Sequence, residues 1–102
     1  DNNLFEVRSI EGGLARTECG AAFAVEGANR GDTLAIRPEA MHLGPDDTTL
    51  EPTLESVEFH GTGYTLHCQL EGRDLLVDAD RRPEAPITVG VPIEAVQVLP
   101  GD

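Results

Sequence analysis

The sequence contains no lysine and no tryptophan, and these absences exclude some functions. All seven basic residues are arginines. A P-loop needs a lysine that reaches the β- and γ-phosphates of a nucleotide, so this chain does not hydrolyse ATP by that route. Only three Phe and one Tyr supply aromatic rings, which argues against a large flat aromatic binding surface.

Positive charge is also scarce. Nineteen acidic residues against seven basic ones give a formal net charge of -12. This charge opposes adsorption to phosphate backbones and anionic lipid headgroups, so we expect no nucleic-acid partner. No apolar run approaches the roughly 20 residues of a membrane span, and Asp1-Asn2-Asn3 is unlike the start of a signal peptide. We therefore predict a cytoplasmic protein that does not insert into a membrane.

The chain has only two cysteines, Cys19 and Cys68. Disulfides are rare in cytosolic proteins. Cys68 alternates in phase with Leu66 and Leu70, which predicts a reduced thiol buried on the apolar face of a strand. The environment of Cys19, next to Gly20, is left open.

Neither a metal site nor a catalytic site is predicted. The spacing of His42, His60 and His67 matches no structural zinc pattern. The only serines, Ser9 and Ser56, do not stand in a G-x-S-x-G motif, and the carboxylates are scattered. We expect no catalytic residues and no metal ligands.

Length and hydrophobic alternation predict one all-β domain over residues 1–102. Asn2-Asn3 reads as a linker, and short strands follow, separated by Gly or Pro. Ser56 disturbs the alternation of its strand and predicts a bulge. The expected strands are 4–10, 14–25 with a break at Gly20, 34–36, 53–60, 64–70, 75–80, 87–91 and 94–99, and the expected loops are 27–32, 44–49 and 81–86.

The most distinctive stretch runs from Asp32 to Leu43. A short apolar strand, Leu34 to Ile36, ends at Arg37-Pro38-Glu39, because Pro38 has no N–H for a ladder and favours an extended Arg37. A turn is expected from Glu39 to His42. Arg37 and Glu39 are interpreted as local charges that fix this corner, and a contact surface for a partner remains the alternative.

Three pieces of sequence resemble the TOBE domain, an accessory domain of ABC-importer ATPase subunits. They are GDTLAIRPE at Gly31–Glu39, VEFHGTGY at Val57–Tyr64 and VGVPIEAVQVLP at Val89–Pro100. The resemblance implies an OB-like small β-barrel at the C-terminal end of a longer ATP-binding subunit. ATP and Mg²⁺ would bind the missing N-terminal domain, and no cofactor is expected in this part.

The same resemblance implies an accessory, regulatory function without chemistry of its own. The implied partners are a second copy of the domain, the ATPase core and, through it, membrane permease subunits at the inner face of the cell membrane. The alternative function is binding of a small oxyanion such as molybdate, with Gly61-Thr62-Gly63 as the candidate nest, although a charge of -12 opposes an anion.

Pairing of two chains with this charge requires a contact face that is locally uncharged. Two segments are nearly free of charge, Ala21 to Val25 and Val91 to Leu99. We therefore expect a homodimer through apolar surface, with these segments as candidates.

Overall fold

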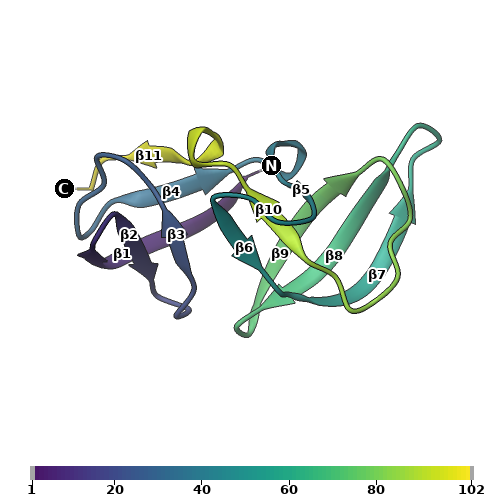
Figure 1. Cartoon of the computed structure of the whole chain (residues 1–102), viewed down its shortest axis with the longest axis horizontal. Helices are drawn as coiled ribbons and strands as arrows, with labels where there is room; N and C mark the ends of the chain where they lie inside the picture. The colour runs from purple at the N-terminus through teal and green to yellow at the C-terminus, as the bar shows by residue number, and fades with distance from the viewer. Residues whose placement is uncertain (1, 102) are drawn as a thin grey trace.

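Short strands and two single turns of 3-10 helix make up the computed structural model, which describes residues 2–101 (Figure 1). The all-β prediction is confirmed. The strands form three antiparallel sheets of an OB-like fold, and no single closed barrel joins the strands of the described residues. Among these residues, no helix is both long enough and apolar enough to span a membrane.

The first sheet has five strands in the order β11-β4-β1-β2-β3. Within β1, Phe5 and Val7 are buried, as the alternation predicts, and a bulge between Val7 and Ser9 shifts the register against β2. The turn after β1 uses Gly12 and Gly13, both at positive φ, as expected for a glycine pair. The bounds are β1 Asn3–Glu11, β2 Leu14–Thr17, β3 Ala22–Ala24, β4 Thr33–Ile36 and β11 Gln97–Leu99.

The second sheet is small and lies between the other two in Figure 1. Its central strand is β10 (Val89–Val91), flanked by β5 (His42–Leu43) and β6 (Thr48–Leu50). The prediction of a loop over 44–49 was wrong at its end, because Thr48 and Thr49 belong to β6. A strand of three residues is too short to show a period of two, and its partner lies far along the chain.

The third sheet is a meander of β7 (Thr53–Phe59), β8 (Tyr64–Leu70) and β9 (Arg73–Ala79). The register of β7 shifts between Leu54 and Ser56, which confirms the predicted bulge. On β8, Leu66, Cys68 and Leu70 are buried, as predicted.

Phe59 lies on the same face of β7 as Leu54 and Val57, but at the end of the strand. Its side chain is 63% exposed, and its ring packs beside that of Tyr64 with 5.2 Å between ring centroids. The bulge between Leu54 and Ser56 keeps Leu54, Val57 and Phe59 on one face despite their uneven spacing, and Phe59 is exposed because it is the last residue of the strand.

One hydrophobic cluster draws side chains from all three sheets. Phe5 and Phe23 are fully buried with their ring centroids 4.8 Å apart, and Arg73 places its guanidinium 4.6 Å from the Phe5 ring centroid. The same Arg73 pairs with Glu18 of the β2–β3 turn. The third sheet is thereby held against the first by apolar packing and by one charged contact.

Asn3 links the first sheet to the third and is not the linker residue that the sequence suggests. It begins β1 and is only 8% exposed. Its side-chain amide exchanges two hydrogen bonds with the backbone of Leu76: Nδ2 donates to the carbonyl at 2.9 Å, and Oδ1 accepts from the N–H at 2.9 Å. Nδ2 also donates to the carbonyl of Ile36 at 3.1 Å. One side chain therefore extends the edge of β9 as a strand backbone would.

The C-terminal segment was expected to be one strand over 94–99. It begins instead with the 3-10 turn η2 (Ile93–Ala95), and β11 follows from Gln97. Pro92 stands directly before η2 in an extended conformation, and its fixed φ suits the residue that precedes a turn.

The two proposed dimer segments bury their main apolar side chains. Phe23 and Val91 are fully buried, and Ala21, Val25 and Val96 are at most 9% exposed. These side chains face the core of the same chain, whereas Leu99 of the second segment is 38% exposed.

Candidate functional site

A groove of about 350 Å³ lies where the corner after β4 meets the end of β9. It brings together two regions that the sequence analysis singled out separately, Glu39 of the corner and Thr62 of the glycine turn. The lining residues are Glu39, Met41, His42, Leu43, Thr62, Asp78, Ala79 and Asp80.

The groove combines an apolar floor with acidic groups. Met41 is 3% exposed and packs into the core, while Glu39, Asp78 and Asp80 contribute three carboxylates. No arginine lines it. A long cationic side chain fits this combination, because its methylene stem can cover apolar surface while its charged head meets carboxylates.

The corner itself is fixed by Pro38 more than by its charged neighbours. Pro38 is buried at the first position of the 3-10 turn η1 (Pro38–Ala40), and Arg37 before it is extended at φ -73°, ψ 143°. The Arg37 and Glu39 side chains are 68% and 62% exposed, with 4.0 Å between nitrogen and oxygen. Such an exposed pair contributes little to stability, so both side chains are available to a partner.

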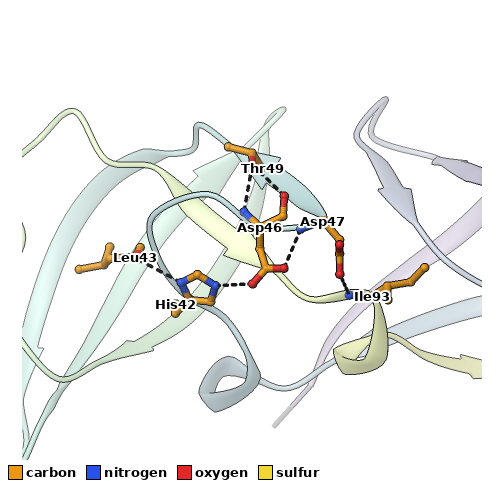
Figure 2. Close-up of polar contacts among 6 residues, drawn as sticks. All are labelled: His42, Leu43, Asp46, Asp47, Thr49 and Ile93. Atoms are coloured by element: carbon orange, nitrogen blue, oxygen red, sulfur yellow. Dashed lines mark hydrogen bonds and ion pairs between the residues drawn. The ribbon is translucent and has the colours of Figure 1, made fainter.

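His42 of β5 forms one wall of the groove and is held by Asp46 (Figure 2). Its Nε2 lies 2.7 Å from Asp46 Oδ2, and its Nδ1 lies 3.1 Å from the carbonyl oxygen of Leu43. The hydrogen bond to Asp46, with a smaller contribution from the Leu43 carbonyl, raises the pKa of His42. The pKa of Asp46 is lowered, chiefly by the bond from His42 and then by the backbone N–H of Asp47.

The loop after β5 connects this pair to η2. Asp47 accepts a hydrogen bond from the backbone N–H of Ile93 at 2.8 Å, which places its carboxylate at the start of η2 (Figure 2). Asp46 also accepts the N–H of Asp47 at 2.7 Å. Beneath the pair, β10 carries Gly90, where an added Cβ would lie 2.8 Å from the His42 ring and 2.5 Å from the carbonyl oxygen of Gly44. Only glycine fits this crossing without displacement.

The other two histidines lie at the third sheet. His67 Nε2 is 3.2 Å from Glu58 Oε1. His60 Nε2 is 2.6 Å from Thr65 Oγ1, which in turn donates to Asp78 Oδ1 at 3.2 Å. Among the described residues, no three His, Cys, Asp or Glu side chains are arranged to hold a metal ion.

Gly61, Thr62 and Gly63 form the turn between β7 and β8, and Gly61 has a positive φ of 87°. Across this turn, the backbone N–H of His60 donates to the Gly63 carbonyl at 2.8 Å. Since Thr62 shares its groove with three carboxylates, the local field disfavours an oxyanion there.

Asp32 has a structural role that the sequence analysis missed. Its carboxylate accepts the backbone N–H groups of Gly101 at 2.9 Å and Asn29 at 2.8 Å. These two bonds, the one from Gly101 first, lower the pKa of Asp32. The second residue of the GDTLAIRPE stretch therefore anchors the segment after β11 beside β4.

The two cysteines are free and differ in exposure. Burial, with a smaller contribution from the charge of Glu55, raises the pKa of the Cys68 thiol to about 11. Cys19 is half-buried, and its sulfur lies 3.4 Å from the hydroxyl of Thr17.

A model of the TOBE domain family matches residues 34–99, about two-thirds of the chain. The chain belongs to the TOBE domain family. The match spans the corner, the glycine turn and η2, so every element that lines the groove of this TOBE domain lies within it. No curated protein matches the chain. Family membership is consistent with a small regulatory or ligand-binding domain without catalysis of its own.

Proposed function

We propose that this TOBE domain is an accessory, regulatory module of the ATP-binding subunit of an ABC importer, where it supports the pairing of two such subunits. ATP and Mg²⁺ would bind the ATPase core of the subunit, which would contact the membrane permease subunits at the inner face of the cell membrane. The observation that carries the proposal is the family match over residues 34–99. TOBE domains often occur in such subunits.

The groove supports a protein partner over a small anion. Its apolar floor and three carboxylates suit the cationic side chains of a protein surface. The oxyanion alternative requires clustered N–H groups, hydroxyls or cations, and Thr62 supplies one hydroxyl beside those carboxylates.

The experiment compares the ATP-binding subunit that carries this domain with a version truncated before Asn3. Both are reconstituted with the permease subunits, and ATP binding, subunit pairing and substrate uptake are measured. We expect the truncated subunit to bind ATP normally but to pair less tightly and to lose control of uptake. A gene that encodes no nucleotide-binding motifs upstream of this domain would refute the proposal.

Calorimetric titration of the isolated domain with molybdate tests the alternative. We expect no heat of binding at millimolar molybdate, because three carboxylates and no arginine line the groove. Saturable binding that is lost when Thr62 is changed to Val would support the ligand-binding function instead.

A further inference from the structure

The acidic groove lies beside a second surface of opposite charge. Arg81 lines a neighbouring groove of about 210 Å³, and Leu43 lines both grooves. Arg81 and Arg82 follow Asp80 just after the end of β9 and are exposed. Within residues 2–101, neither arginine has a carboxylate within 4.0 Å.

The charges of these two surfaces are complementary. With His42 neutral, the first groove carries a formal charge of -3 from Glu39, Asp78 and Asp80. Arg81 and Arg82 are offset in part by Glu84, which lines the second groove, so that surface carries +1. We define the two grooves together with Arg82 as the bipolar face.

We propose that the bipolar face is where two copies of this chain meet, with Arg81 and Arg82 of each copy entering the acidic groove of the other. The inference rests on the pairing in the proposed function and names the surface that performs it. In a two-fold symmetric dimer the same patch serves both copies, so it must be complementary to itself. A patch with a negative half and a positive half meets this condition.

The sequence places the two halves next to each other. Asp80 belongs to the acidic groove and Arg81 to the neighbouring one, so a two-fold axis passing near this junction forms both charged contacts at once. Each contact would pair arginine with carboxylates, which guanidinium groups bind through charge-assisted hydrogen bonds. Leu43 and Ala79, which are half-buried, offer apolar surface to the arginine stems.

The net charge of the chain also favours the bipolar face over a contact between two surfaces that are both negatively charged. Two chains of -12 repel each other unless the contact brings opposite charges together. Because Phe23 and Val91 of the uncharged segments face the core of the same chain, the proposed contact relies on ion pairs instead. Added salt should therefore weaken this dimer, because salt screens the attraction between exposed opposite charges.

The test uses two variants that invert opposite halves of the face. Arg81→Glu with Arg82→Glu makes the face negative throughout, and Glu39→Arg with Asp80→Arg inverts two of the three groove carboxylates. These four side chains make no buried hydrogen bond, so both variants should fold, which thermal melts will check. Sedimentation equilibrium measures the dimer dissociation constant of each variant alone and of their mixture.

We expect each variant alone to dimerise at least about tenfold more weakly than the unchanged chain, since like charges meet at both contacts. The mixture should recover a heterodimer, because both contacts then join opposite charges. Matched controls make the same charge changes on the first sheet and its loops. Arg8→Glu with Arg30→Glu, and Glu11→Arg with Glu26→Arg, should leave dimerisation within about threefold and show no recovery on mixing.

Failure to recover a heterodimer on mixing, or a chain that stays monomeric at every concentration and at low salt, would overturn the inference. The proposed function would survive that result if the full ATP-binding subunits still pair and control uptake, since the pairing surface would then lie elsewhere. Conversely, a gene without upstream nucleotide-binding motifs refutes the proposed function, while recovery of the heterodimer would still support pairing through the bipolar face.

Discussion

Replacing Asn3 by alanine should destabilise the domain far more than any other change to a polar side chain near the N-terminus. The substitution removes three hydrogen bonds, two to the backbone of Leu76 and one to the carbonyl of Ile36. At a net value of about 0.5–1.5 kcal/mol each, the loss in free energy of unfolding is about 1.5–4.5 kcal/mol. This is a large fraction of the roughly 5–15 kcal/mol that holds a domain of this size folded.

Urea unfolding monitored by circular dichroism gives this free energy, with an unchanged slope showing that the folded state stays intact. Asn2→Ala is the matched control, because Asn2 is exposed, and it should change stability by less than about 0.5 kcal/mol. Hydrogen exchange adds a local measurement: the Leu76 amide should lose protection in Asn3→Ala and keep it in Asn2→Ala. A loss below about 1 kcal/mol, with that amide still protected, would refute the account of Asn3 as a strand substitute.

Three further predictions concern single sites. Cys68 should react slowly with a thiol reagent in the folded protein and rapidly in denaturant, since its thiol is buried with a pKa of about 11; rapid labelling of the folded protein would contradict its placement. Gly90→Ala should lower the thermal midpoint markedly, whereas Gly63→Ala, whose added Cβ meets a carbonyl oxygen at a milder 3.2 Å, should lower it less. Equal effects would show that the His42 ring and the Gly44 backbone both shift at little cost. In NMR titrations the pKa of His42 should lie above its ordinary value and should fall in Asp46→Asn. Because the pKa of His42 is raised and that of Asp46 is lowered, the pair stabilises the fold most between about pH 4 and 6.5. This contribution declines as pH rises through the pKa of His42 or falls through the pKa of Asp46.

The sequence was most informative where a strand is long and has one apolar face. The alternation of Tyr64 to Leu70 predicts both the strand and its buried side, and Ser56 predicts the bulge in β7. Pro38 predicts the corner after β4 for a reason that belongs to the residue itself, its missing N–H. In each case the signal is local, so a single sequence carries it.

What the sequence could not predict depends on partners far along the chain. Asn3 resembles a linker residue because an asparagine shows no preference for burial until the backbone of Leu76 is placed beside it. The groove could not be predicted from the sequence either, since Glu39, Thr62 and Asp78 come from three separate elements. The exposure of Phe59 could not be predicted either, because alternation shows which face of β7 is apolar but not where the core beside that face ends.

The order of strands in the first two sheets has a consequence for synthesis of the protein. β10 is the central strand of the second sheet, and β11 is an edge strand of the first, yet both come last among the described strands. While residues 89–99 are still inside the ribosome, β5 and β6 have no strand between them and one edge of β4 is unpaired. The β7-β8-β9 meander, whose pairings are all between neighbours in sequence, can form in the meantime. The nascent chain therefore carries open strand edges during synthesis, and its high negative charge keeps such chains apart until the last strands arrive.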